Sequence, residues 1–574
     1  MYFRTSTIKG RTYLLLVEAY RENGKARQRT IASFGLLEDA ISSGKLERLL
    51  LSGERYVKKL VILSEAKNGD ITPLSTKKIG AYLIFRRLWN DLGINSVISS
   101  CSDGRNFGFS MERVLFAAVL QRLVNPDSDR AGVKWLLANQ LDCDESIRLH
   151  QLYRAMKWLG EPLKSDSCGM ENEADDRVSD TKASDPVKGP KCVRCTKDLL
   201  EEEIYFKRRD LFSSLELYYF DTTSLYFEGA GGDELGRRGH SKDHRPDLNQ
   251  VILGMVSDNF GTPVFTEIWP GNTSDVTTLR PVSDRLQKRF HANGICVIAD
   301  RGMISKNAIE QIEKKNWSYI LGARMRQEKE LQVVMADDGP YEEVTGERVK
   351  SNDPAPLKVK EIKVGGNRYV VCINEEEARK DKYDREAILK SLEEALRKGD
   401  KALIGNKGYK RFVKANRNSF EIDKVKAMEE EKYDGKFVLK TNLTSPASEI
   451  AIKYKQLLMV ETIFRTSKST LQTRPIHHQC DEAIRGHIWC SFLALLLRKT
   501  LMDAMGENQK EGEVKVEWKD LINDLEMLTY SKIQIKETSF ELRSEACPGA
   551  KRAFRALGMK LPDHIKFDKT KTED

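Results

Sequence analysis

Apolar runs of strand length alternate with short polar turns between residues 215 and 325, and this pattern predicts a β-rich region. The first three runs cover 217–221, 251–257 and 263–269, and the turn sequence Asp258-Asn-Phe-Gly separates the last two. Helical spacing then covers 277–290 and 306–316, and further strand-like runs occupy 295–300 and 318–321. The predicted order is three antiparallel strands, helix, strand, helix and strand.

The hydrophobic pattern changes on both sides of this region. Regular helical spacing, loss of large apolar residues and alternation of charged with β-branched residues mark the changes. They predict these segments, in chain order: a basic α/β N-terminal region (1–75), a helical domain (76–163), a flexible linker (164–198), the first part of an α/β core (199–324), a β-rich insertion (325–434), the second part of the core (435–500) and a helical C-terminal region (501–574). The order of elements in the core is that of a ribonuclease-H-like mixed sheet.

Length and charge narrow the class of protein. With 574 residues the chain is too long for one hydrophobic core, and its formal net charge of +9 modestly favours a polyanionic partner. Seven Lys and Arg residues fall between Arg4 and Arg29, where DNA binding competes with an ordinary solvated face. No leader-like sequence opens the chain, and the apolar run 488–497 suits a buried helix rather than a membrane span. The ten scattered cysteines suggest free thiols in a reducing compartment.

Two predicted strands end in an aspartate, namely Asp221 and Asp300. Alone, each aspartate is ordinarily a turn or helix cap. Further along, Tyr454, Glu461 and Lys468 are spaced seven residues apart, which predicts that they share one face of a helix within 446–473. Two strand-end aspartates and a helix glutamate can together bind two divalent ions about 3.5–4 Å apart, as phosphoryl transfer on DNA requires.

These segments resemble the DDE transposases of bacterial and archaeal insertion sequences, in particular the branch with a β-rich insertion before the catalytic glutamate. That branch carries the signature Tyr-x2-Arg-x3-Glu-x6-Lys, which Tyr454, Glu461 and Lys468 match, whereas Leu457 stands at the arginine position. Further similar segments are Tyr219-Phe-Asp-Thr-Thr-Ser, Gly239-His-Ser-Lys-Asp-His-Arg-Pro-Asp-Leu-Asn-Gln, Pro270-Gly-Asn-Thr-Ser-Asp, Ala299-Asp-Arg-Gly-Met and Arg474-Pro-Ile-His-His. The resemblance runs from about residue 1 to 500 and is strongest at 215–325 and 435–495.

The resemblance implies that Asp221 and Asp300 bind a shared Mg²⁺ or Mn²⁺ ion and that Glu461 binds a second ion. It also implies DNA contacts by two signature residues and by four other cations: Tyr454, Lys468, Lys242, Arg245, Arg465 and Arg474. For the segment that carries Lys242, a solvated basic loop is the alternative. The implied partners are terminal inverted repeats and target DNA, bound by a homodimer or larger multimer. We expect a prokaryotic cytoplasmic protein, associated with the nucleoid and not with a membrane.

Two other functions are compatible with the same residues. The first is a ribonuclease-H-like structure-specific nuclease, but such enzymes are usually smaller and lack the 160 residues that here separate Asp300 from Glu461. The second is a domesticated DNA-binding protein without catalytic activity. The presence of all three acids argues against it, and the departure at Leu457 keeps it open.

Three weaker signals have ordinary structural explanations. Cys192-Val-Arg-Cys195 lacks the second pair of ligands that structural zinc needs. The repeated His-x2-Cys spacing that begins at His477 is typical of a metal site, but its second half, His487 and Cys490, lies in the apolar run. Trp269 could stack on a flipped base, although a core position is the more usual one.

Overall fold

The computed structural model describes most of the chain. The described residues are 1–22, 25–44, 46, 48, 71–139, 147–163, 193–208, 217–291, 295–303, 305–326, 329–337, 339–344, 357–397, 411–416, 419–509, 512–535 and 538–567. They form two compact units, the first from 1–77, 529–545 and 562–574 and the second from 78–528 and 546–561. Most of the predicted linker, 164–192 with Cys192, lies outside the described residues.

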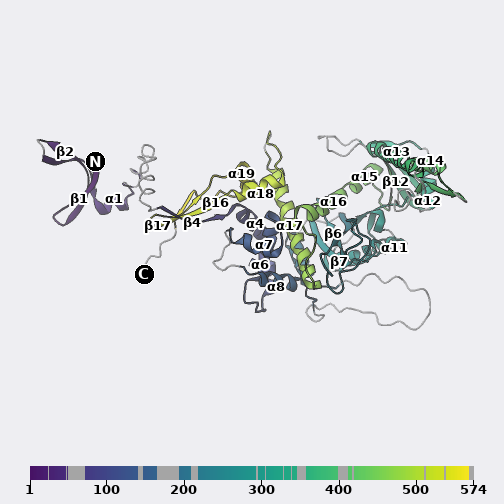
Figure 1. Ribbon diagram of the computed structural model, residues 1–574, viewed down its shortest axis with the longest axis horizontal. Helices are drawn as coiled ribbons and strands as arrows, with labels where there is room; N and C mark the ends of the chain where they lie inside the picture. Colours follow the sequence, from purple (N-terminus) through teal and green to yellow (C-terminus); the bar gives the residue numbers. More distant parts are fainter. Residues whose placement is uncertain are drawn as a thin grey trace. The chain divides into compact units, whose positions relative to one another are not determined.

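The first unit contains two small sheets (Figure 1). One consists of β1 (Tyr2–Ile8), β2 (Arg11–Glu22) and β3 (Lys25–Leu36), followed by α1 (Leu37–Ser42). This segment therefore has strands followed by a helix, in agreement with the α/β character expected of it, and two of its strands reach 12 residues.

The other sheet of the first unit corrects the expectation of a wholly helical C-terminal region. Its order is β18 (Ile565–Phe567), β17 (Thr538–Arg543), β16 (Thr529–Ile535) and β4 (Ile71–Lys78). The partner of β16 is more than 450 positions earlier in the chain, so the local pattern of apolar and polar residues could not reveal the pairing. Helices α18 (Trp518–Glu526) and α19 (Pro548–Ala556) match the helical expectation.

A nine-stranded mixed sheet forms the centre of the second unit. Its first five strands in sequence are β5 (Leu217–Tyr226), β6 (Gln250–Ser257), β7 (Pro263–Pro270), β8 (Cys296–Ala299) and β9 (Ser318–Gly322). They lie in the order β7-β6-β5-β8-β9; β6 is antiparallel to both neighbours, whereas β5, β8 and β9 run parallel. Almost every residue of β6 and β7 is buried, which explains their continuous apolar sequences. The α/β class and this order of elements are as predicted.

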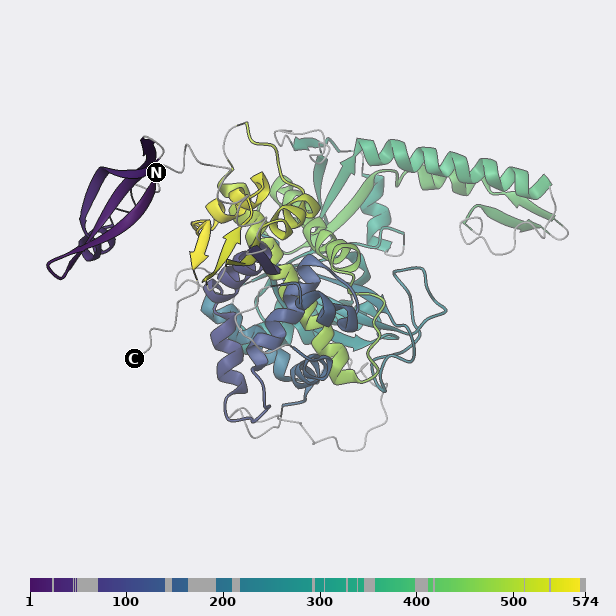
Figure 2. The ribbon, with the colours of Figure 1, turned by 60° about the vertical axis from the view of Figure 1, so that its left-hand side comes forward.

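The region predicted as an insertion continues the same sheet. Beyond β9 come β15 (Lys436–Thr441), β12 (Asn367–Asn374), β11 (Leu357–Val364) and β10 (Glu342–Val344), all antiparallel. The other elements of the region are α12 (Lys329–Ala336), α13 (Glu375–Arg397), β13 (Val413–Asn416), β14 (Ser419–Ile422) and α14 (Lys424–Glu431). The long charged helix α13 lies beside β14, as Figure 2 shows. Arg385 of α13 makes an ion pair with Asp434, which follows α14.

The second unit also contains a set of helices, several of which contact one long helix. They are α4 (Gly80–Asp91), α5 (Ile94–Ser102), α6 (Met111–Val124), α7 (Asp129–Leu136), α8 (Leu149–Gly160), α9 (Thr196–Arg208), α10 (Leu279–Arg289), α11 (Lys306–Lys314) and α17 (Asp481–Glu507). Helix α17 contacts α6 and α8 on one side and β7 on another (Figure 1). Its run 488–497 is buried, as predicted for a core helix. Among the described helices, none is long and apolar enough to cross a membrane.

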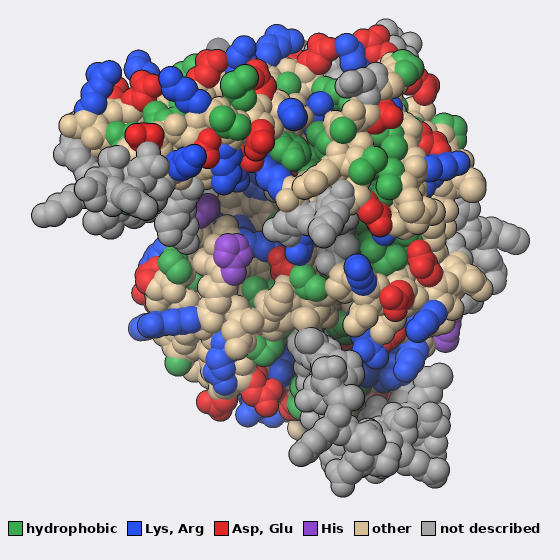
Figure 3. Space-filling view, turned by 90° about the vertical axis from the view of Figure 1, so that its right-hand side faces the viewer, with side chains coloured by type: hydrophobic (Ala, Val, Ile, Leu, Met, Phe, Trp, Pro, Cys, Tyr) green, Lys and Arg blue, Asp and Glu red, His purple; other side chains and the backbone are tan. Residues whose placement is uncertain are grey.

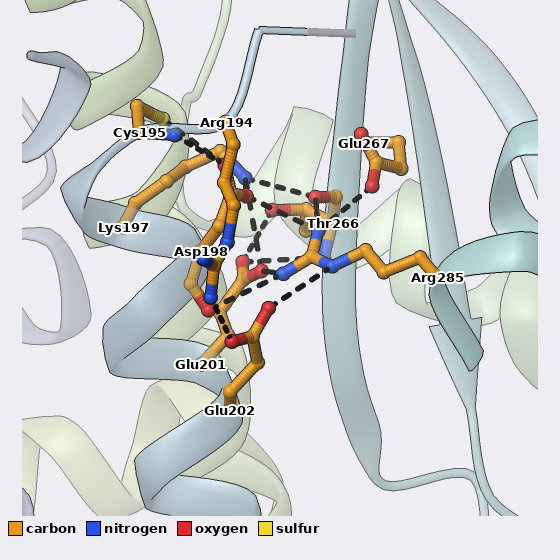
Figure 4. Close-up of polar contacts among 9 residues, drawn as sticks. All are labelled: Arg194, Cys195, Lys197, Asp198, Glu201, Glu202, Thr266, Glu267 and Arg285. Atoms are coloured by element: carbon orange, nitrogen blue, oxygen red, sulfur yellow. Dashed lines mark hydrogen bonds and ion pairs between the residues drawn. The ribbon is translucent and has the colours of Figure 1, made fainter. Parts of the chain in front are cut away.

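A buried ionic network ties α9 and α10 to β7 (Figure 4). The guanidinium of Arg285, whose side chain is 9% exposed, lies 2.8 Å from Glu201 Oε2, 2.8 Å from Glu267 Oε1 and 3.1 Å from Asp198 Oδ1. Lys197 Nζ donates to the Thr266 carbonyl at 2.9 Å. Burial raises the pKa of the Glu201 carboxyl, against the attraction of Lys197 and Arg285. Arg285 is therefore the cation that compensates several buried acids at once.

Replacement of Arg285 by methionine should destabilise the protein strongly, because Glu267 loses its ion pair and Lys197 alone remains to compensate Asp198 and Glu201. We expect a loss of about 3–5 kcal/mol in the free energy of unfolding, measured by urea denaturation. Lys288→Met, on an exposed position of the same helix, is the matched control and should change stability by no more than about 0.5 kcal/mol. Equal midpoints for the two variants would contradict this role of Arg285.

Candidate active site

Asp221 and Asp300 occupy equivalent positions on neighbouring parallel strands. The register of β5 with β8 pairs Leu217 with Cys296 and ends with Phe220 opposite Ala299. The residue that follows each of these two positions is an aspartate, Asp221 after Phe220 and Asp300 after Ala299. Because paired residues of parallel strands project to the same face of a sheet, continuation of this register by one residue would place both carboxylates on one face. The negative charge of Asp300 raises the pKa of Asp221, as expected for neighbouring acids. The pairing predicted from the two apolar runs is therefore present.

Asp221 does not end its strand, which corrects one detail of the prediction. β5 continues to Tyr226 and pairs with β6 along this extension. What ends beside Asp221 is β8, which is only four residues long and stops at Ala299. Asp221 is thus the first residue of β5 after the paired stretch with β8, and it lies next to the point where β8 ends.

Glu461 completes the group of three acids. It lies in α16 (Leu458–Arg465), which packs against β5 and β6. Burial raises the pKa of Asp221 to about 7, opposed mainly by Lys242, and the negative charges of Asp300 and Glu461 raise it further. Each of these two acids is therefore close enough to Asp221 to act on its ionisation. Glu461 itself is exposed.

The stretch that carries Glu461 is not the single helix that was predicted. α15 (Ala447–Lys455) ends before Gln456, α16 follows, and residues Thr466–Thr470 form a π-helical turn, η6. A tight turn joins the two α-helices, with the Leu457 amide bonded to the Tyr454 carbonyl at 2.9 Å. Leu457 is buried at this junction, 6% exposed, which explains an apolar residue where the signature has arginine. The seven-residue spacing therefore spans two α-helices and a π-helical turn rather than one uninterrupted helix.

Tyr454 contacts the acid pair directly. Its hydroxyl donates to Asp300 Oδ1 at 3.1 Å, and its ring stacks on Phe437 of β15 with centroids 5.9 Å apart. On the other strand, the backbone amide of Thr222 donates to Asp221 Oδ1 at 2.7 Å. Both carboxylates are thus oriented by hydrogen bonds from the protein.

Lys242 lies next to the acids, together with a residue that the sequence did not identify. Its Nζ donates to the Thr222 carbonyl and hydroxyl, both at 2.7 Å, and lies 3.2 Å from Asp275 Oδ2. Asp275 Oδ1 in turn accepts from the Thr222 hydroxyl at 2.7 Å. Asp275 therefore holds Lys242 where its charge lowers the pKa of Asp221. The sequence signal that could have identified Asp275 is its position at the end of segment 270–275, which contains Gly and Pro.

The remaining predicted cations lie in three different surroundings. Lys468 and Arg474 both contact Asp243, a second acid that was not assigned. Arg245 binds Asp247, and its guanidinium lies 5.6 Å from the ring centroid of Tyr226. Arg465 is exposed at the end of α16. The structure therefore brings Lys468 and Arg474 together and leaves Arg465 apart from them.

The donor set at the three acids suits a hard divalent cation. Carboxylate oxygens are the ligands that Mg²⁺ prefers, and a cation would compensate the negative charges that Asp300 and Glu461 add beside the buried Asp221. Within the described part of the chain, no three Asp, Glu, His or Cys side chains are gathered closely enough to enclose an ion. Mg²⁺ commonly binds through one or two carboxylates together with waters and substrate phosphates, and the Asp221–Asp300 pair fits this mode.

The weaker signals occupy structural positions. His487 lies in α17 with its ring nitrogens 3.1 Å from Arg122 Nη2 and 3.0 Å from the Thr473 carbonyl. Burial lowers the pKa of His487 well below its usual value. Trp269 is fully buried in the core of β7, so it cannot stack on a base. Cys195 is buried beside Asp198, and the described cysteines are free thiols.

Comparison with known proteins identifies the family. The model described as "Transposase DDE domain" matches residues 214–497, and the model described as "IS1634 family transposase, N-terminal domain" matches residues 3–66. No curated protein matches the chain. Among solved structures, a piggyBac transposase synaptic complex with hairpin DNA is similar at 10% identity and a TM-score of 0.36, over 78% of this chain and 79% of that chain. A Mos1 transposase paired-end complex is similar at 10% identity and a TM-score of 0.13, over 38% and 61%.

The two family models together cover more than half of the residues. The chain belongs to the DDE transposases of insertion sequences. It is therefore an enzyme that cleaves DNA strands and transfers them, and enzymes of this family generally use divalent metal ions.

The elevated pKa of Asp221 predicts a pH-dependent stability of the metal-free protein. A carboxyl whose folded pKa is raised from 3.8 to about 7 stabilises the fold fully below pH 4, and this contribution is lost as pH rises through 7. Asp221→Asn should therefore be more stable than wild type at pH 8.5, by up to about 4 kcal/mol, and nearly equal to it at pH 4.

Thermal unfolding in EDTA at the two pH values measures this difference. Asp233→Asn, an exposed carboxylate in the connection between β5 and β6, is the control and should behave like wild type at both. Addition of Mg²⁺ at pH 8.5 should stabilise wild type more than Asp221→Asn. A pH-independent effect of Asp221→Asn would contradict the assignment.

Proposed function

We propose that this transposase cuts and joins DNA at the ends of its insertion sequence with Asp221, Asp300 and Glu461 as the catalytic acids. The observation that carries the proposal is the register of β5 and β8, which sets Asp221 and Asp300 at equivalent positions. The effect of Asp300 and Glu461 on the ionisation of Asp221 supports a shared site. The strand order β7-β6-β5-β8-β9, with three parallel strands at one side, supports a ribonuclease-H-like core.

Asp221 and Asp300 would hold one Mg²⁺ or Mn²⁺ ion, and Glu461 would hold a second. When bound, the two ions stabilise the attacking and leaving oxygens of an in-line displacement at phosphorus. The chain contributes orientation: the Tyr454 hydroxyl holds Asp300, the Thr222 amide holds Asp221, and Lys242 offsets negative charge beside them. In strand cleavage water attacks the phosphorus and the 3′ oxygen leaves. In strand transfer that 3′ hydroxyl attacks a target phosphate and displaces the 3′ oxygen of the target strand, so one group of acids can serve both steps.

Cations around the acids are suited to bind the DNA backbone. Phosphate contacts from Lys and Arg give affinity and orientation, while base contacts give sequence choice. The cations and the tyrosine proposed for this role are Lys242, Arg245, Arg465, Lys468, Arg474 and Tyr454. Lys and Arg side chains and histidines gather along the hollow that crosses the face in Figure 3. The N-terminal sheet, with its basic residues between Arg4 and Arg29, is proposed to bind the terminal inverted repeats.

A homodimer or larger multimer follows from the reaction, because two DNA ends have to be cut and joined to the same target. The expected place of action is the prokaryotic cytoplasm, at the nucleoid, where the DNA substrate is. The segmentation proposed above would then assign 1–75 to DNA-end recognition and 199–324 with 435–500 to catalysis.

Cleavage of end DNA tests the proposed function. Wild type in Mg²⁺ or Mn²⁺ should cut DNA that carries the terminal repeats of its element at the repeat boundary. Asp300→Ala and Glu461→Gln should each lower the rate about 1,000-fold or more, because each removes a group on which the chemical step depends. Glu449→Gln, an exposed residue of α15, is the control and should cut at the wild-type rate.

Two results would contradict the proposal. Specific binding of the repeats without cleavage in either metal would indicate a domesticated DNA-binding protein. Cleavage of branched DNA regardless of repeat sequence would indicate a structure-specific nuclease.

A further inference from the structure

Asp243 lies between two cations from a distant part of the chain. Its Oδ1 accepts from Lys468 Nζ at 2.8 Å, and its Oδ2 is 3.5 Å from Arg474 Nε. The Asp243 side chain is only 6% exposed, and that of Lys468 is 12% exposed. This nearly buried carboxylate, 225 residues before Lys468, therefore links the connection between β5 and β6 to the segment that follows Glu461.

The backbone around Asp243 is held firmly. The amides of Asp243 and Arg245 both donate to Ser241 Oγ, at 3.3 and 3.1 Å. The amide of the preceding Lys242 donates to Ser224 Oγ of β5 at 2.9 Å. Because these bonds anchor the loop to the central sheet, the position of the Asp243 carboxylate is set by the same strand that carries Asp221.

The charges explain why an acid is needed at this position. Burial lowers the pKa of Lys468, Asp243 opposes that effect, and the positive charges of Arg474 and Lys242 lower the pKa further. These three groups face the Lys468 ammonium. Without Asp243, Lys468 would lose its ion pair while the positive charges of Arg474 and Lys242 remain close to it.

We propose that Asp243 is a positioning residue for strand cleavage, whose carboxylate holds Lys468 and Arg474 as a fixed pair that receives one phosphate of the DNA strand. This inference rests on the proposed function. An ammonium has three N–H donors, so Lys468 can bind a phosphate oxygen while it keeps its bond to Asp243. Arg474 contacts Asp243 through Nε, and this contact does not involve the two terminal amino groups of the guanidinium. Those amino groups are suited to bind the same phosphate. The carboxylate itself does not touch the DNA.

Cleavage kinetics with end DNA test the proposal through the purified full chain. Asp243→Asn should lower the rate at saturating DNA about 10- to 100-fold, because the cations lose their fixed positions, with a smaller change in Kd. Lys468→Met should lower the rate by at least as much. The double variant should lose less than the product of the two single losses, because both substitutions remove the same Lys468–Asp243 contact and only the Arg474 contact is lost in addition. Asp233→Asn, an exposed acid in the same connection, is the control.

Two further readouts separate positioning from a merely structural role. In Asp243→Asn the alkaline limb of the pH–rate profile should move to lower pH, because Lys468 loses the carboxylate that keeps it protonated. Asp243→Glu retains the charge and should recover the wild-type alkaline limb and part of the rate. If Asp243→Asn does not fold, comparison of Asp243→Glu with wild type and with Lys468→Met provides the same test.

Several outcomes would overturn the inference. Tighter DNA binding by Asp243→Asn with wild-type cleavage would make Asp243 a stand-in for phosphate rather than a positioning group. Additive losses in the double variant, or an unchanged pH profile, would show that Asp243 does not act through Lys468. If wild type cleaves and Asp243→Asn equals it, this inference alone fails. If wild type does not cleave end DNA, the proposed function fails and this inference with it.

Discussion

The parallel register of two short strands is the constraint on which the candidate site depends. β8 has four residues, and its pairing with β5 makes Asp221 and Asp300 the next residues on adjacent strands. Side chains at paired positions share a face, so the two acids meet without any contribution from flexible loops. A shift of one residue in this register would send one carboxylate to the opposite face. The buried apolar residues of β5 and β8 keep the register in place.

Grouped acids need compensating charge, and the protein supplies it in an ordered way. Lys242 stands beside Asp221 because Asp275 and Thr222 hold its ammonium. A second acid, Asp243, binds Lys468 and Arg474. Two acids outside the proposed catalytic group, Asp275 and Asp243, thus hold these cations. The same principle operates in the core, where Arg285 is surrounded by buried carboxylates that tie α9 and α10 to β7.

Local patterns were sufficient to predict much of this fold, and they also indicated the three acids that we propose for the site. Strands such as β6 and β7 are apolar along their whole length and end at turn residues, and a strand that ends near an aspartate leaves a clear mark in the sequence. Interactions between distant segments left no such mark. Nothing near Lys468 indicates that its partner is Asp243, and nothing in β16 indicates that it pairs with β4. Regular seven-residue spacing also concealed the tight turn at Leu457, because the spacing describes an uninterrupted helix.

The central claim is that segments around Asp221, Asp300 and Glu461 converge on one divalent-metal site. Iron-directed cleavage tests it most directly: Fe²⁺ replaces Mg²⁺, ascorbate and peroxide generate hydroxyl radicals at the bound ion, and the cut positions in the protein are mapped by mass spectrometry. We predict cuts near all three residues, suppressed by excess Mg²⁺ and absent in Asp300→Ala. Cuts confined to one of the segments, or equal cutting in Asp300→Ala, would contradict the convergence of the three acids on a metal ion.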